Sequence, residues 1–206
     1  MLVIGLTGGI GMGKSAAAEH FARRGVPVFN ADACVHRLYE GLAVAPIEAA
    51  FPGVTQAGRV DRKLLAAEVA GSPERLRQLE KIVHPMVVKA EIDFLREQER
   101  KGAQLAVLEI PLLFETGAEA RVDVTIVLSA PSEVQRERVL ARPGMTQEKF
   151  ADLVARQLPD TKKRARSDFI VDSGTSLADM RGEIDKLIES LQKREGRVME
   201  RLRRLK

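Results

Sequence analysis

Eight consecutive residues near the amino terminus have the types and the spacing of a phosphate-binding loop. They read Gly8-Gly9-Ile10-Gly11-Met12-Gly13-Lys14-Ser15, which matches the pattern G-x-x-x-x-G-K-[ST] in full. Glycines allow consecutive backbone N–H groups to turn inward around a phosphate, and the start of a following helix adds partial positive charge. Lys14 can reach the outer phosphates, and the Ser15 hydroxyl can ligate Mg²⁺. The segment therefore predicts binding of a nucleoside triphosphate with Mg²⁺.

The loop alone does not specify the reaction, and three classes compete: a small-molecule kinase, a GTPase switch, and an ATPase motor or nucleic-acid enzyme. A GTPase should carry a guanine-reading N-K-x-D motif, but Thr161-Lys162-Lys163-Arg164 lacks the acid. A motor ATPase usually has an acidic residue at a strand end that helps to hold Mg²⁺. Glu109 is the one candidate, and chance explains it as well as function does. The sequence favours the kinase class.

Asp32 is the candidate for acceptor chemistry. It follows a short apolar run in Phe29-Asn30-Ala31-Asp32, and ligands of open α/β sheets bind at the carboxyl ends of strands. A carboxylate there can take the proton of an attacking hydroxyl and aim its oxygen at the γ-phosphoryl group. The alternative is that Asp32 caps a helix over 33–40. Spacing alone favours neither role.

Five short runs of β-branched and aliphatic residues should be the strands of one sheet. They are mostly continuously apolar, which is typical of strands buried on both faces of a parallel sheet. Helical patterns alternate with them, so we predict a doubly wound α/β fold. The first helix should span Ser15–Arg24 and the last should begin near Ser176. The strands are expected at Leu2–Leu6, Val26–Phe29, Leu105–Ile110, Val122–Leu128 and Phe169–Val171.

Two long connections interrupt this core. In the first, Ser72-Pro73-Glu74 should begin a helix and Pro85 should begin the next one. The second, near 132–167, is rich in arginine and fits a lid that closes over the nucleotide, although most of its arginines should lie on an exposed helix surface. Its arginines are Arg136, Arg138, Arg142, Arg156, Arg164 and Arg166.

Composition and charge limit the binding partners and the cellular compartment that this protein can have. The net charge is +4, but residues 193–206 carry seven basic and two acidic side chains, so the rest of the chain is near −1. We expect this basic segment to be a solvated helix end, with nucleic-acid contact as the minority reading. Cys34 is the single cysteine, and the apolar runs are shorter than the roughly 20 residues of a membrane span. These features favour a cytoplasmic protein without a membrane or nucleic-acid partner.

Several stretches taken in order resemble the dephospho-CoA kinases, which have the P-loop kinase fold. The resemblance begins with Gly5–Ser15 and Asp32 and covers residues 1–190. It continues through Leu79-Glu80-Lys81-Ile82-Val83-His84-Pro85, Ile110-Pro111-Leu112-Leu113-Phe114-Glu115, the pair Arg138 and Arg142, Arg156-Gln157, and Ser167-Asp168-Phe169-Ile170-Val171-Asp172.

The resemblance implies transfer of the ATP γ-phosphoryl group to the ribose 3′-hydroxyl of dephospho-CoA, with Mg²⁺. It implies a five-stranded parallel sheet of order 2-3-1-4-5. The core would comprise 1–32, 103–131 and 168–192, the helical acceptor lobe 33–102, the lid 132–167, and the basic end 193–206. A nucleoside or nucleotide kinase of the same core, or an ATP-dependent nucleic-acid factor, is the alternative. A monomer is favoured.

By position, the resemblance assigns roles to individual residues. Asp32 would be the base, Lys14, Arg138 and Arg142 would act on the transferring group, and Gly8–Ala16 would hold the nucleotide. The acceptor would contact Thr7, Asp32, His84, Pro85 and Leu112.

The chain departs from the family pattern at three places. Met12 and Ala16 stand where serine and threonine are common, at positions that work mainly through backbone N–H groups. Asp172-Ser173 stands where Asp-Asn is usual, in a segment that should lie near the adenine.

Overall fold

The computed structural model describes residues 1–204, which divide into two compact units. One unit comprises residues 1–29 together with the chain from Leu95 onward, and the other comprises Asn30–Phe94. The first contains the phosphate loop and the second contains Asp32, so each unit is described by itself.

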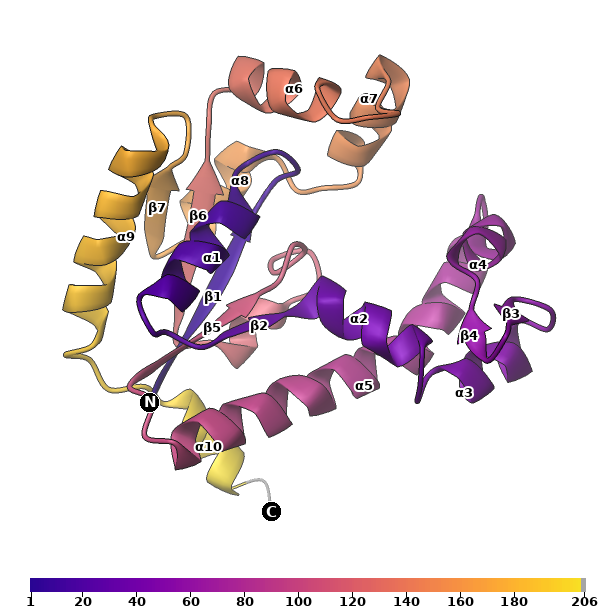
Figure 1. Cartoon of the computed structure of the whole chain (residues 1–206), viewed down its shortest axis with the longest axis horizontal. Helices are drawn as coiled ribbons and strands as arrows, with labels where there is room; N and C mark the ends of the chain where they lie inside the picture. Colours follow the sequence, from indigo (N-terminus) through magenta and orange to yellow (C-terminus); the bar gives the residue numbers. More distant parts are fainter. Residues whose placement is uncertain (205–206) are drawn as a thin grey trace. The chain divides into compact units, whose positions relative to one another are not determined.

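The first unit is built on a five-stranded sheet with the order β2-β5-β1-β6-β7 (Figure 1). The pairings of β1 with β5, β1 with β6, and β6 with β7 are parallel. The expected strands and their order are therefore confirmed. The strands are β1 (Leu2–Gly8), β2 (Val28–Asn30), β5 (Leu105–Glu109), β6 (Val124–Ser129) and β7 (Phe169–Asp172).

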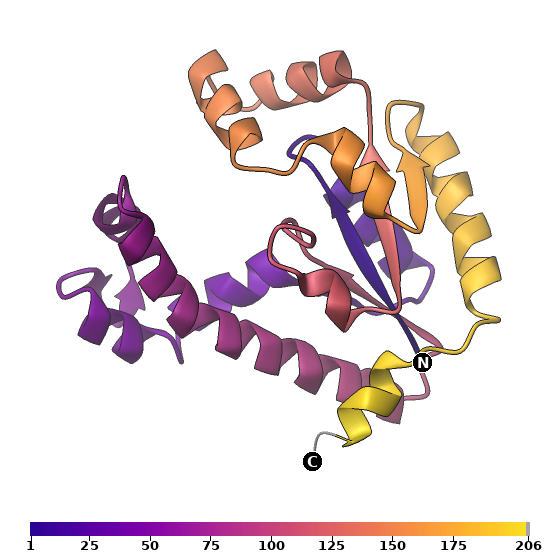
Figure 2. The ribbon, with the colours of Figure 1, turned by 180° about the vertical axis from the view of Figure 1, so that it is seen from behind.

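Two long helices cover one face of this sheet. In Figures 1 and 2, α1 (Lys14–Arg23) and α9 (Leu177–Leu191) lie on one side and α8 (Asp160–Arg166) on the other. Phe21 of α1 and Ile184 of α9 are fully buried against the strands. Ser176 caps α9 by accepting a hydrogen bond from the Asp179 N–H at 3.1 Å. Both helices thus form close to the places that the sequence predicted.

The remaining elements of the first unit include three helices with short connections. After β5 comes a 3₁₀ helix, η1 (Ala118–Arg121), and after β6 come α6 (Ser132–Leu140) and α7 (Gln147–Ala155). Thr146 caps α7 by accepting a hydrogen bond from the Lys149 N–H. Helices α6, α7 and α8 occupy the segment that we expected to be the lid. We keep the name lid for residues 132–167, and its closure over a nucleotide stays a prediction.

The second unit is helical apart from one small hairpin. Its elements are α2 (Ala31–Tyr39), α3 (Val44–Ala50), the paired strands β3 (Thr55–Gln56) and β4 (Arg59–Val60), α4 (Arg62–Val69), and most of α5 (Pro73–Arg100). The hairpin is too short to have a recognisable sequence period. Asp61 caps α4 by accepting hydrogen bonds from the N–H groups of Lys63 and Leu64.

The expectation that Pro85 begins a new helix is wrong, because α5 continues through it without a break. Pro85 cannot donate the hydrogen bond that its position in a helix requires. However, Leu79, Val83, Glu91 and Leu95 are buried along one stripe that extends to both sides of the proline. Burial of that stripe outweighs the single missing bond.

The basic segment is a separate helix and not the end of α9. Helix α9 ends at Leu191, and α10 (Val198–Arg204) lies beside the start of β1 (Figures 1 and 2). Val198 and Met199 are buried there. Of the seven basic residues, Lys206 lies outside the described residues.

A single carboxylate joins this helix to the first strand. Asp123 Oδ1 accepts hydrogen bonds from the N–H groups of Arg197 at 2.6 Å and Val198 at 2.9 Å. Its other oxygen, Oδ2, accepts one from the Val3 N–H at 2.9 Å. The backbone of the segment after α9 is therefore docked on the first unit, while the basic side chains described there stay exposed.

Candidate active site

The phosphate loop connects β1 to α1, and two of its glycines have left-handed backbone. Gly11 has a φ of 76° and Gly13 a φ of 79°. Gly13 is also the N-cap of α1, whose first residue is Lys14. The loop thus meets the amino-terminal end of a ten-residue helix, where backbone N–H groups without helical partners favour an anion.

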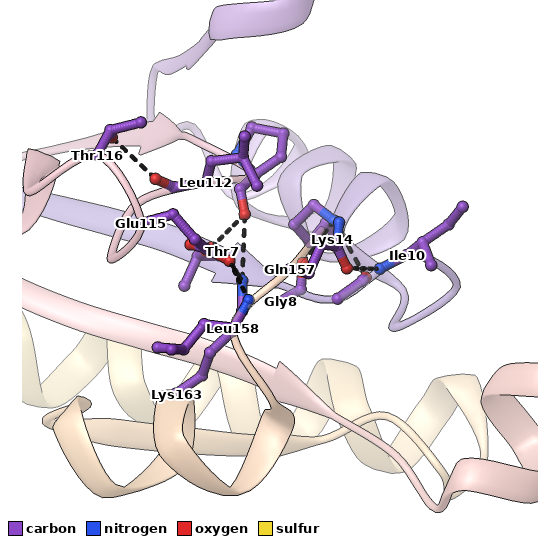
Figure 3. A network of polar contacts seen from close by, with 12 residues as sticks. Thr7, Gly8, Ile10, Lys14, Leu112, Glu115, Thr116, Gln157, Leu158 and Lys163 are labelled. Carbon is purple, nitrogen blue, oxygen red and sulfur yellow. Dashed lines mark hydrogen bonds and ion pairs between the residues drawn. The ribbon is translucent and has the colours of Figure 1, made fainter. Parts of the chain in front are cut away.

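The Lys14 side chain folds back over the loop that precedes it. Its Nζ donates hydrogen bonds to the carbonyl oxygens of Gly8 at 2.8 Å and Gly9 at 3.2 Å (Figure 3). Ser15 is exposed at the first turn of α1. The ammonium group and the hydroxyl expected to meet the phosphates and Mg²⁺ therefore lie next to each other in the chain, at the helix start.

A cavity of about 330 Å³ lies over the loop. It brings together the loop, two of the six lid arginines, and the segment between β7 and α9. It is lined by Gly11, Met12, Gly13, Lys14, Ser15, Ala16, Arg138, Arg142, Ser173, Thr175, Ser176, Leu177 and Met180. Its walls are thus rich in N–H donors and cations, which suit a polyphosphate.

Ser173, where the chain departs from the family pattern, is built into this cavity. It is buried, and its Oγ lies 3.0 Å from the carbonyl oxygen of Met12 and 3.1 Å from that of Ser129, so its one proton serves one of them at a time. Its own carbonyl oxygen accepts a hydrogen bond from Arg138 Nη2 at 2.7 Å. The serine therefore ties the loop, β6 and a lid arginine to one another.

Other lid arginines have contacts away from the cavity. Arg136 donates a hydrogen bond to Gln147, and Arg166 pairs with Glu119 while its guanidinium lies over the Phe114 ring. The expectation that most lid arginines belong to the protein surface fits these positions.

A buried polar network connects the end of β1 to the base of the lid (Figure 3). Lys163, of which the side chain is 1% exposed, forms an ion pair with Glu115 at 2.8 Å. Lys163 Nζ lies 3.4 Å from the carbonyl oxygen of Pro111, which also accepts a hydrogen bond from Thr7 Oγ1 at 3.1 Å. Thr7 is fully buried, so its hydroxyl positions the Pro111 loop. Leu112, the next residue, is partly exposed.

The pKa of the Glu115 carboxyl reflects two opposing effects. Burial raises the pKa, but hydrogen bonds from Lys163 and from the Leu158 N–H lower it, and the net shift is downward. Glu115 is therefore ionised opposite the Lys163 ammonium group.

In the second unit, Asp32 lies in the first turn of α2 and is exposed. The helix is capped by Asn30, whose side-chain oxygen accepts a hydrogen bond from the Ala33 N–H at 2.7 Å. The alternative role of Asp32 as the cap is therefore wrong, and its carboxylate stays available for other chemistry.

Asp32 also lines a cavity of about 450 Å³ between α2, α4 and α5. The polar groups in its wall are Asp32, His36, Tyr39 and Arg62, and the apolar ones are Val35, Leu65, Ala66, Val69 and Leu79. Burial raises the pKa of the Tyr39 phenol despite the nearby Arg62. The phenol is thus a neutral hydrogen-bond donor beside a carboxylate and a guanidinium group.

Sequence reasoning missed His36, Tyr39 and Arg62. The first two recur with Asp32 at helical spacing, which is the signal that could have found them. His84 and Pro85 are exposed residues of α5 and do not line this cavity.

Residues 1–204 contain neither a side-chain cluster suited to a metal ion nor a helix suited to crossing a bilayer. Within that range, no group of three or more His, Cys, Asp or Glu side chains is arranged to hold a metal ion. None of the helices described there has the length and apolar character needed to span a bilayer.

Comparisons with known proteins agree on one family. A sequence model of the dephospho-CoA kinase family matches residues 2–179. A dephospho-CoA kinase of Brucella melitensis biotype 1 is 53% identical over 191 residues, which cover 93% of this chain and 96% of that protein. A dephospho-CoA kinase of Mesorhizobium japonicum is 52% identical over 197 residues, which cover 95% of this chain and 100% of that protein.

Solved structures agree with this result. A crystal structure from Thermus thermophilus has a TM-score of 0.81 at 37% identity, and the match covers 92% of this chain and 97% of that chain. The dephospho-CoA kinase from Campylobacter jejuni shares the fold, with a TM-score of 0.63 at 24% identity over 93% and 98% of the chains. This chain belongs to the dephospho-CoA kinase family, whose members are ATP-dependent kinases that phosphorylate a hydroxyl group.

Proposed function

We propose that this protein phosphorylates the ribose 3′-hydroxyl of dephospho-CoA from ATP, with Gly8–Ala16 as the nucleotide site and Asp32 as the general base. The observation that carries the proposal is the cavity in which the phosphate loop meets Arg138 and Arg142. Donors aimed at transferring phosphoryl oxygens are the main source of catalysis in this reaction class.

The chain's own residues would act on the nucleotide as follows. Backbone N–H groups of the loop and the start of α1 hold the β-phosphate. Lys14 exchanges its carbonyl contacts with Gly8 and Gly9 for phosphate oxygens, which are stronger acceptors because they are charged. Arg138 and Arg142 neutralise the charge that spreads over the transferring group.

The residues at the helix start also fit Mg²⁺. The exposed Ser15 hydroxyl lies beside Lys14 in the cavity wall and would hold the ion. When bound, Mg²⁺ neutralises the negative charge of the phosphates. Glu109, buried at the end of β5 and paired in register with Leu6 of β1, is a second candidate.

Asp32 would serve the acceptor. Its carboxylate accepts the proton of the 3′-hydroxyl and orients the oxygen for in-line attack. The neighbouring His36, Tyr39 and Arg62 supply donors for the anionic groups of dephospho-CoA. Contacts of the acceptor with His84, Pro85 and Leu112 stay predictions, whereas Thr7 would act through the Pro111 loop. A cytoplasmic, monomeric enzyme without a nucleic-acid partner is also a prediction.

Mass spectrometry of the products tests the assignment directly. The protein is incubated with ATP, Mg²⁺ and dephospho-CoA, and we expect coenzyme A and ADP. In thermal-shift measurements, dephospho-CoA should stabilise the protein and nucleoside monophosphates should not. Phosphorylation of a nucleoside monophosphate instead would support the nucleotide-kinase alternative and contradict this proposal.

The role of Asp32 has its own test. Asp32→Asn should lower turnover by at least about 100-fold, the usual scale for a lost general base. The affinity for ATP should stay unchanged, because the loop is untouched. Glu40→Gln, an exposed neutral substitution in the same unit, is the matched control. Near-normal turnover of the Asp32 variant would remove this residue from the mechanism.

A further inference from the structure

The main chain of Ile10, near the middle of the phosphate loop, is held on both sides by glutamines of the lid. The Ile10 N–H donates a hydrogen bond to Gln157 Oε1 at 3.0 Å (Figure 3). The Ile10 carbonyl oxygen accepts one from Gln135 Nε2 at 2.8 Å. Because a backbone N–H only donates and a carbonyl only accepts, the orientation of both amide groups is fixed. We call these three residues the Ile10 clamp.

The clamp brings the lid into direct contact with the loop. A Cβ atom added at Gly9 would lie 3.1 Å from Gln135 Nε2 and 3.4 Å from Gln157 Oε1. One added at Gly11 would lie 2.6 Å from Val139 Cγ2 of α6. A side chain at Gly9 would thus crowd the ends of both glutamines, and one at Gly11 would clash with helix α6.

The clamp also acts on the helix that carries the lid arginines. Gln135 and Arg138 are three residues apart in α6 and so share one face of the helix. Gln135 is bonded to Ile10, and Arg138 is bonded to the Ser173 carbonyl at 2.7 Å. Helix α6 is thus fixed to the nucleotide cavity at two points one turn apart, and Arg142 follows at its end.

We propose that Gln135 and Gln157 are positioning residues for phosphoryl transfer. By holding both polar groups of Ile10, they set α6 over the loop so that Arg138 and Arg142 face the transferring group. Charge-stabilising groups are effective only when they are preorganised, and small displacements of such groups are costly. This inference rests on the proposed kinase activity, because the arginines act on the group that is transferred.

The first experiment removes each hydrogen bond without changing side-chain length. Gln135→Met and Gln157→Met should each lower kcat by about tenfold while KM for dephospho-CoA changes less than about twofold, since positioning acts on the transferring group. Gln147→Met, also in the lid but bonded to Arg136 at the surface, should leave both constants unchanged. Thermal denaturation of all variants reports on folding. A kcat that stays within about twofold in both clamp variants would overturn the proposal.

A second experiment uses the opposite hydrogen-bonding roles of the two glutamines: Gln157 accepts a hydrogen bond from Ile10, and Gln135 donates one to it. Glu in place of Gln157 still offers an acceptor to the Ile10 N–H, whereas Glu in place of Gln135 sets a carboxylate against the Ile10 carbonyl. Both changes add the same charge at the same loop, so the difference between them reports on the hydrogen bonds. We expect Gln157→Glu to retain clearly more turnover than Gln135→Glu, and equal losses would contradict the clamp.

Hydrogen exchange of the Ile10 amide gives a readout independent of activity. In the free protein, exchange should be about five- to tenfold faster in Gln157→Met, the factor for one neutral hydrogen bond, and close to wild type in Gln157→Glu. Unchanged exchange in Gln157→Met would reject the contact itself. Wild-type protein that does not phosphorylate dephospho-CoA would refute the proposed function instead, and the exchange result would still stand.

Discussion

Gly11 combines a left-handed backbone with a close contact to the lid helix α6, and these two constraints can be separated. Gly11→Ala would place a methyl group 2.6 Å from Val139 at a φ of 76°. At Gly144, φ is 74° and nothing lies within 4 Å of an added Cβ. Gly144→Ala therefore has the backbone strain without the clash.

We expect Gly144→Ala to lose about 1 kcal/mol of the free energy of unfolding with normal turnover. Gly11→Ala should lose clearly more, and its turnover should fall because α6 is pushed off the loop. Chemical denaturation and steady-state kinetics measure the two effects. Equal losses in the free energy of unfolding in the two variants would show that α6 can move away from Gly11 at no energetic cost.

Individual site residues were predictable where a motif states its chemistry. The family resemblance, and not residue type, singled out Arg138 and Arg142. These two arginines line one cavity with the loop residues Gly11–Ser15, and their roles in the reaction stay predictions. The sequence did not identify Gln135 and Ser173 as site residues. Their side chains bond backbone atoms that are distant in the sequence. Such contacts arise from the fold, and no spacing rule relates them.

At the scale of elements, helix α5 shows how packing overrides a local signal. Pro85 lacks the N–H that would bond within the helix. Pro85→Ala should restore that bond and raise the free energy of unfolding by about 1 to 2 kcal/mol. Pro73→Ala, at the first residue of the same helix, should give no such gain because that N–H has no helical partner. Urea denaturation distinguishes the two, and a Pro85 variant less stable than wild type would contradict the argument.

The ion pair between Lys163 and Glu115 should stabilise the base of the lid in a pH-dependent way. Glu115→Gln keeps an acceptor for the Leu158 N–H but leaves the buried ammonium group without its counter-charge. At pH 7 we expect a loss of about 3 kcal/mol. Because the pKa of Glu115 is lowered in the folded protein, its stabilising effect is complete above the unfolded value of 4.5 and disappears as the pH falls through the folded value.

Denaturation of wild type and Glu115→Gln at pH 7 and near pH 4 measures this effect. The difference in the free energy of unfolding between the two proteins should be smaller at the lower pH. Glu97→Gln removes an exposed pair with Lys101 and should hardly change stability. A difference that does not depend on pH would show that the carboxylate charge is not what stabilises the lid.

The elements were predictable to different degrees. The buried strands have continuous apolar runs, and Ser176 caps α9, so these elements were predicted to within a few residues. The hairpin of β3 and β4 has two residues per strand, too few for a period. The unbroken α5 depends on burial on both sides of Pro85, which the local sequence does not reveal.

For the whole molecule, α10 is the feature that the charge pattern described least well. The basic side chains described by the structure are exposed, as a solvated end requires, but Val198 and Met199 are buried and Asp123 binds two backbone N–H groups of the segment. Deletion of residues 193–206 should therefore lower the stability by about 2 to 3 kcal/mol through the lost apolar burial. Turnover at low temperature should survive, because the cavity over the phosphate loop contains no residue of this segment.

Thermal denaturation and kinetics at 15 and 37 °C measure both outcomes. Arg204→Ala removes an exposed charge of α10 that pairs with Glu200 of the same helix, and it is the control that should leave the melting temperature unchanged. A deletion as stable as wild type would show that the docked helix contributes nothing.

The position of β1 at the centre of the sheet has a consequence for how the chain folds as it is synthesised. This strand is synthesised well before its two neighbours in the sheet, Leu105–Glu109 and Val124–Ser129. Until those two segments have been synthesised, the strand is an apolar segment without hydrogen-bonding partners in the sheet, and such segments are prone to aggregation. Formation of the phosphate loop, which continues from β1, must then await β6, so ATP can assist folding only in its last stages.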